Sequence, residues 1–140
     1  MNALISFGNT FLYRRIAGEI YKSSLDIRIG FVHAANSRSE SLNLDIAEIF
    51  KPIIVDKVIF AVINKGQILK NRHFEQTEEG GVFLNKEGKR IFIHELEDKL
   101  YQKVTIDGKA MTYDTIIRNE VYKIYHTVME DEKYKPFKYT

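Results

Sequence analysis

Apolar residues recur at three- and four-residue spacings near the start of the chain, which predicts an amphipathic helix from about Asn2 to Tyr21. Asn2 is a residue type that often caps a helix N-terminus. A turn is expected after Lys22, and the short apolar stretch Ile27–His33 is expected to be extended or irregular. The inward positions of the helix are predicted to be Leu4, Phe7, Phe11, Leu12, Ile16, Ala17 and Ile20.

A second apolar series predicts that the segment from Ser41 to Asn64 is mostly helical. Pro52 lies inside this segment and is expected to kink or divide the helix, because proline removes a backbone donor and crowds the preceding turn. The pair Lys65-Gly66 is expected to end it. The inward positions are predicted to be Leu42, Leu44, Ile49, Ile53, Ile54, Val58, Ile59 and Val62.

Two more helices are predicted in the second half of the chain, over Lys86–Lys103 and Thr112–Met129. Asn85 is a suitable cap for the first, and Asp107-Gly108 is a turn signal that separates the two. The stretch 68–81 before them is polar, and Glu79-Gly80-Gly81 at its end is expected to form a loop just before Val82. The inward positions are predicted to be Phe92, Ile93, Leu96, Leu100, Ile116, Ile117, Val121, Ile124, Tyr125 and Val128.

Helical periodicity therefore dominates the chain, and we expect an all-α fold of four to six helices in one domain over residues 1–140. A chain of 140 residues with 44% apolar residues is large enough to build its own core. It has no cysteine, which excludes disulfides and thiolate metal sites. We expect a cytoplasmic protein with no membrane partner, because no apolar run is long enough to cross a bilayer and no secretion signal is present.

One imidazole and two carboxylates form the clearest candidate for chemistry. Asp45 and Glu48 are three residues apart on a predicted helix, which places both on one face, and His33 precedes that helix. Such a set can hold Mg²⁺ or Mn²⁺, hard ions that keep open positions for a substrate phosphate. On spacing alone, surface carboxylates and a loop or core histidine are the more common interpretation of this pattern. The other histidines, His73, His94 and His126, lie among charged residues and are expected on solvated faces.

Several short segments, in this order along the chain, resemble the C-terminal domain of the CRISPR adaptation integrase, the larger subunit of spacer acquisition. These segments are Asn2–Gly8, Ile29–His33, Ser41–Glu48, Phe50–Pro52, Ile63–Gln67, Gly80–Leu84, Glu87–Arg90, Tyr113–Glu120 and Tyr134–Phe137. Together they span nearly the whole chain, and their order makes the resemblance more specific than the three candidate ligands alone.

The resemblance implies a helical, metal-dependent DNA endonuclease and integrase domain with Mg²⁺ or Mn²⁺ as its cofactor. His33 and Glu48 match ligand positions of the family, and Asp45 matches a second acid beside the metal. The implied reaction joins short DNA segments to a CRISPR repeat by attack of 3′-hydroxyls on phosphodiesters. The implied partners are branched or spacer DNA, the repeat, a small adaptation subunit and a second copy of the chain.

The family also carries an N-terminal β-rich domain and a glutamate metal ligand upstream of Asn2–Gly8, and this sequence starts after both. We therefore expect weakened metal binding and little activity from these 140 residues alone. Glu19 does not match the position of that ligand. The apolar first helix also suggests self-association of the chain.

Lysines and arginines supply the candidate DNA contacts, because phosphate binding needs only a cation within reach. The residues are Arg38, Lys51, Lys65 and Arg72, with Arg38 favoured because it follows His33. With 21 basic and 19 acidic residues the formal charge is +2, so DNA contacts must come from local patches, and the same residues fit a solvated surface. The competing hypothesis is a non-catalytic helical module that binds DNA or protein without a metal.

Overall fold

The computed structural model describes residues 2–22, 44–130 and 137, with the backbone alone for 124–130. The predicted turn after Lys22, the segment Ile27–His33 and the candidate residues His33 and Arg38 lie outside these ranges. The elements in chain order are α1 Asn2–Lys22, a helical stretch over residues 44–50, the π-helix η1 Lys51–Asp56, α4 Lys57–Asn64, β1 Phe74–Gln76, β2 Val82–Leu84, α5 Lys86–Leu100, β3 Lys103–Ile106, β4 Lys109–Thr112 and α6 Tyr113–Glu130.

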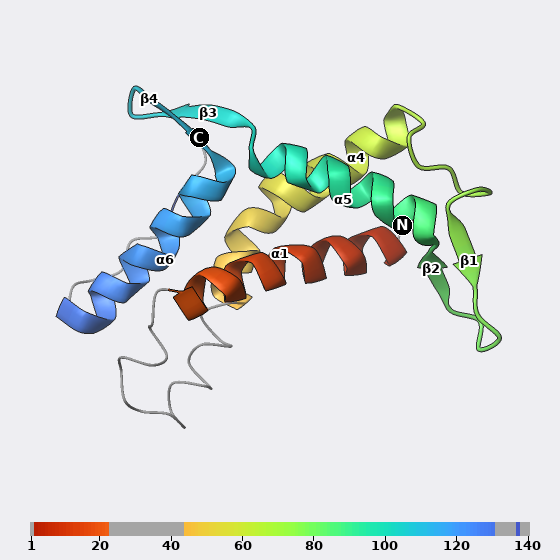
Figure 1. The fold of residues 1–140 in the computed structure, drawn as a ribbon, viewed down its shortest axis with the longest axis horizontal. Helices are drawn as coiled ribbons and strands as arrows, with labels where there is room; N and C mark the ends of the chain where they lie inside the picture. Colours follow the sequence, from red (N-terminus) through yellow and green to blue (C-terminus); the bar gives the residue numbers. More distant parts are fainter. Residues whose placement is uncertain (1, 23–43, 131–136, 138–140) are drawn as a thin grey trace.

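Helices α1 and α5 both pack on the helix made by η1 and α4, and α6 packs across one end of α1 (Figure 1). Four of the inward residues predicted for α1 are buried, and the other three are partly buried. The core is aliphatic with a few aromatic rings. Its contributors include Leu12 and Ile16 from α1, Ile54 and Val62 from η1 and α4, Phe92 and Leu96 from α5, and Ile117 and Val121 from α6.

The predicted helix of residues 41–64 is continuous over its described part, residues 44–64, but contains a π-helical turn. Pro52 lies near the start of this turn, where the wider helix gives the proline ring room that an α-helix would not. The helix ends at Lys65, and Gly66 follows with a positive φ of 69°, as the sequence predicted. The prediction that Leu44 points inward is wrong, because 51% of its surface is exposed.

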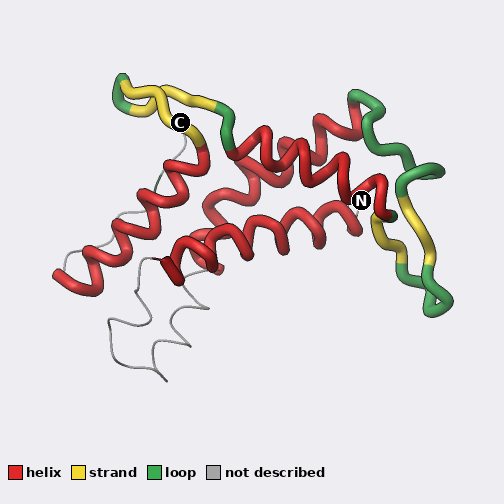
Figure 2. Tube along the Cα trace, in the orientation of Figure 1, coloured by secondary structure: helices red, strands yellow, loops and turns green. Residues whose placement is uncertain are grey.

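The expectation of an all-α fold is correct for most of the chain but misses two antiparallel hairpins. Strand β1 pairs with β2, with Phe74 opposite Leu84, and β3 pairs with β4, with Ile106 opposite Lys109. Figure 2 shows these strands at opposite ends of a body that is otherwise helical. The second hairpin turns at Asp107 and Gly108, which have φ values of 51° and 79°, the left-handed conformation that a two-residue hairpin turn requires.

One hairpin precedes α5 in the sequence and the other follows it. Asn85 caps its first turn by accepting a 2.8 Å hydrogen bond from the backbone N–H of Gly88, as expected from the sequence. At its other end α5 finishes at Leu100, three residues before the predicted boundary, because Lys103 already belongs to β3. No helix within residues 2–22 and 44–130 is long and apolar enough to span a bilayer.

Candidate functional site

Asp45 and Glu48 lie on the helical turn that precedes η1, and both are exposed. Their neighbours Ile46, Ala47 and Phe50 are buried, which fixes the opposite face of this turn against the core. Because i and i+3 positions lie on one side of a helix, the two carboxylates are presented to solvent together. The same-face arrangement predicted from their spacing is therefore present.

Lys51 forms an ion pair with Glu48, the second of these carboxylates. Lys51 Nζ lies 2.7 Å from Glu48 Oε1, in an ion pair whose side chains are 29% and 67% exposed. The Glu48 carboxylate is therefore already paired with a cation, the ammonium of Lys51. Two exposed carboxylates with hard oxygen donors fit Mg²⁺ or Mn²⁺, which take few protein ligands and retain water.

The other predicted DNA contacts that the structure describes lie elsewhere. Lys65 is exposed at the C-terminal end of α4, seventeen positions after Glu48 and about 25 Å away along the helix at roughly 1.5 Å per residue. Arg72 precedes β1, and its Nη2 is 3.2 Å from Glu87 Oε1. The structure therefore brings only Lys51, among the described basic candidates, into contact with the carboxylate pair.

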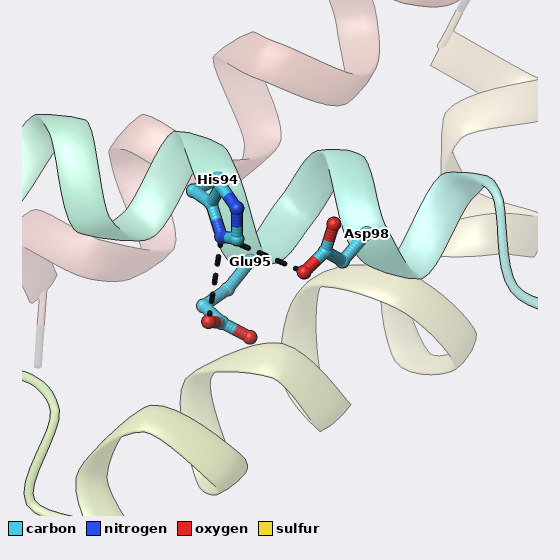
Figure 3. A group of neighbouring side chains, drawn as sticks. All are labelled: His94, Glu95 and Asp98. Atoms are coloured by element: carbon cyan, nitrogen blue, oxygen red, sulfur yellow. Dashed lines mark ion pairs between the residues drawn. The ribbon is translucent and has the colours of Figure 1, made fainter.

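A second group of potential ligands lies on α5, where His94, Glu95 and Asp98 come within 4.8 Å of one another (Figure 3). The Nδ1 atom of His94 is 3.5 Å from Asp98 Oδ2 and 3.7 Å from Glu95 Oε1. The His94 side chain is 70% exposed, which confirms the predicted solvated face, and Glu95 also accepts a 3.0 Å hydrogen bond from Gln67. Exposed pairs at this spacing are ordinary helix-surface contacts.

His73 contradicts the prediction of a solvated face, because it is only 3% exposed. Its Nδ1 accepts a 2.8 Å hydrogen bond from the backbone N–H of Leu69, and its Nε2 is 3.7 Å from Glu87 Oε1. Buried imidazoles need such partners. His73 thus closes the loop between α4 and β1 and has a structural role.

Four charged residues that the sequence reasoning did not single out join α1 to α6. Arg15 Nε donates a 2.6 Å hydrogen bond to Asp114, and its Nη2 is 3.0 Å from Glu19 Oε1, a buried oxygen that is paired by charge without a well-aligned hydrogen bond. Arg118 lies 3.5 Å from both carboxylates. The i, i+4 spacing within Arg15–Glu19 and within Asp114–Arg118 was the available signal.

The charge state of Arg15 follows from this arrangement. Burial by itself lowers the pKa of its guanidinium, but the hydrogen bond to Asp114 and the charge attraction of Asp114 and Glu19 outweigh burial and raise the pKa above its ordinary value. Arg15 is therefore a permanent cation between two acids. This cluster stabilises the packing of α1 against α6 and is separate in sequence from Asp45 and Glu48.

Comparison with known proteins identifies the family. The model of the family "CRISPR associated protein Cas1" matches residues 1–98, well over half of the chain. This chain belongs to the Cas1 family. The curated relatives of the Cas1 chain include an endonuclease Cas1 from Thermodesulfovibrio yellowstonii and one from Clostridium perfringens. Each is 47% identical to it, over 139 and 141 residues, and the alignments cover 98% and 99% of this chain.

Two solved structures share the fold. A Cas1 protein from Thermotoga maritima superposes with a TM-score of 0.77 at 38% identity, over 91% of this chain and 39% of that one. A casposase bound to an integration product superposes with a TM-score of 0.78 at 27% identity, over 94% of this chain and 38% of that one. The Cas1 chain spans 42% of the length of both curated relatives. The resemblance seen in the sequence is thus confirmed for the family.

Proposed function

We propose that this Cas1 chain is the helical catalytic domain, the C-terminal domain of the family, of a divalent-metal-dependent endonuclease and integrase that acts in CRISPR spacer acquisition. The observation that carries the proposal is the exposed pair Asp45 and Glu48 on one helical face, with Glu48 already paired to a cation. Its relatives are named endonucleases, and a structural neighbour is a casposase bound to an integration product.

His33, Asp45 and Glu48 would hold Mg²⁺ or Mn²⁺, which supplies charge neutralisation at the phosphate when bound. Glu48 would supply a carboxylate ligand to the ion. Asp45, one turn earlier on the same face, holds a ligand, a water or the nucleophile in position. The three carry out phosphodiester transesterification, in which a 3′-hydroxyl replaces the leaving 3′-oxygen at a phosphate of the repeat.

Basic residues position the DNA. Lys51 is within reach of any phosphate that binds beside Glu48, since its ammonium contacts that carboxylate. Lys65 and Arg72 contact the backbone further along the duplex, and Arg38 is proposed as a further contact because it follows His33 in the sequence. At one phosphate charge per ~1.7 Å of helix axis, the roughly 25 Å between Glu48 and Lys65 corresponds to several base pairs, so each cation contacts a different part of the backbone.

The proposed partners are branched or spacer DNA, the CRISPR repeat, the small adaptation subunit and a second copy of the chain. The rival function is a helical module that binds DNA or protein without a metal. The two functions differ in their dependence on a divalent ion.

The deciding experiment is Mn²⁺ binding by calorimetry to the chain and to its Glu48→Ala and His33→Ala variants, with nicking of a branched DNA followed in parallel. We expect binding that is lost in both variants, because each removes a ligand. Glu97→Ala, which removes an exposed acid from α5, is the matched control and keeps binding. DNA or protein binding that is indifferent to Mn²⁺ and to both site variants would instead support the non-catalytic module.

A further inference from the structure

The contact between Lys51 and Glu48 joins a proposed DNA-binding cation to a proposed metal ligand. The two atoms, Lys51 Nζ and Glu48 Oε1, are 2.7 Å apart, close enough for a charge-assisted hydrogen bond. Lys51 is the first residue of η1, so its backbone is fixed by a helix whose next turn contributes Ile53, Ile54 and Val55 to the core. The lysine side chain remains partly exposed and can swing while its backbone stays in place.

This ion pair and a bound metal compete for the same carboxylate. A divalent ion at Glu48 would repel the ammonium with two units of charge at a range where the carboxylate attracts it with one. The pair has little stability to resist this, because exposed ion pairs of this type are weak. Metal binding at Glu48 would therefore release Lys51 from the carboxylate.

A DNA phosphate is the anion that a released Lys51 ammonium would bind. A phosphate held beside the metal would offer negatively charged oxygens within reach of the ammonium that Glu48 no longer holds, and phosphate binding by lysine requires only proximity. We propose that Lys51 is an exchangeable counter-ion: it pairs with Glu48 in the metal-free protein and with a DNA phosphate once the metal is bound. This inference rests on the proposed function, since it takes Glu48 to be a metal ligand.

Exchange makes metal and DNA binding interdependent. The ion must displace Lys51 before it can bind the Glu48 carboxylate, so Lys51 weakens metal binding in the absence of DNA. Lys51 strengthens DNA binding only when the metal has freed it, so the metal raises DNA affinity. By thermodynamic reciprocity DNA then raises metal affinity by the same factor. Removing the ammonium should thus tighten metal binding and weaken its coupling to DNA.

The test uses calorimetry with Mn²⁺ in the absence of DNA, on chains that carry His94→Ala so that the donors on α5 do not contribute. Lys51→Met is expected to lower the Kd for Mn²⁺ by about two- to five-fold, in line with the strength of an exposed ion pair. Lys109→Met, an exposed lysine of β4, changes the net charge equally and should leave the Kd unchanged. Lys51→Gln, which keeps a polar side chain, should behave as Lys51→Met does.

The second readout is the affinity for a branched duplex, measured by fluorescence anisotropy with and without Mg²⁺. The parent and Lys109→Met are expected to bind more tightly with the ion, and Lys51→Met is expected to lose most of that gain. Equal Mn²⁺ affinity in Lys51→Met and Lys109→Met would overturn the exchange. If that equality is found while Glu48→Ala abolishes Mn²⁺ binding, the proposed function stands and only the exchange is wrong. If the parent chain binds no Mn²⁺, or Glu48→Ala leaves its binding intact, both are wrong.

Discussion

At the scale of single residues, two glycines of α1 show how differently one residue type is used within one helix. A Cβ atom built on Gly8 would lie 2.6 Å from Val55 Cγ1 and 3.5 Å from Phe92 Cζ, so α1 approaches η1 and α5 closely there. A Cβ built on Gly18 meets no atom within 4 Å. Gly8 is therefore needed for packing, whereas Gly18 only weakens the helix.

We expect Gly8→Ala to destabilise the chain by roughly 1–3 kcal/mol, because the branched Val55 side chain cannot move aside without disturbing the core. Gly18→Ala, the matched control in the same helix, should stabilise it by up to about 1 kcal/mol through helix propensity. Urea denaturation followed by circular dichroism measures both. A Gly8→Ala variant more stable than the parent chain would contradict the close approach.

At the scale of elements, buried charge holds α6 against α1. Glu19 and Asp114 are 3% and 8% exposed, and each lies between the guanidinium groups of Arg15 and Arg118. Each helix contributes one arginine and one acid to this cluster. Removing one arginine therefore leaves the buried carboxylates with less positive charge beside them. Buried ion pairs of this kind make helix docking sensitive to each partner.

Arg15→Met should therefore lower the free energy of unfolding by roughly 2–3 kcal/mol. This is less than the 3–5 kcal/mol typical of a fully buried pair, because Arg15 is partly exposed and Arg118 still faces both acids. Its neighbour Arg14 is exposed, and Arg14→Met should change stability by no more than about 0.5 kcal/mol. Equal stabilities of the two variants in thermal denaturation would show that the cluster does not fix α6.

At the scale of the whole molecule, a net charge of +2 gives little long-range attraction for DNA. Under the proposed function, DNA binding must depend on individual cations, and the described candidates come from different parts of the chain: Lys51 beside Glu48, Lys65 at the end of α4 and Arg72 before β1. The affinity should then reflect a small number of separate phosphate contacts.

We expect DNA affinity in the presence of Mg²⁺ to fall with salt at a slope set by this small number of contacts, since each phosphate contact releases counterions. Lys51→Met should reduce the slope of log affinity against log salt concentration by about 1, the amount expected for one phosphate contact. Anisotropy titrations between low and physiological salt measure the slope. An unchanged slope in Lys51→Met would exclude it as a phosphate contact.

The helices could be predicted from the sequence, because their signals lie within a few residues of one another. Periodic apolar positions located α1, α4, α5 and α6, and the hydrogen bond from Gly88 to Asn85 confirms a cap read from one residue type. The same local logic placed Asp45 and Glu48 on one face. Family-specific segments then gave the Cas1 family, although the roles of these residues, and of His33 outside the described ranges, stay predictions.

Features that depend on residues distant in the sequence could not be predicted from local patterns. The three- and four-residue strands were too short for their own pattern to predict, and the first hairpin packs on α1 and α5. Leu44 is exposed and His73 buried because neighbouring elements, rather than their own residue types, determine what covers them. The contact between Arg15 and Asp114 joins residues 99 positions apart. Periodicity describes neighbours within one helix, whereas such contacts exist only once the helices have packed.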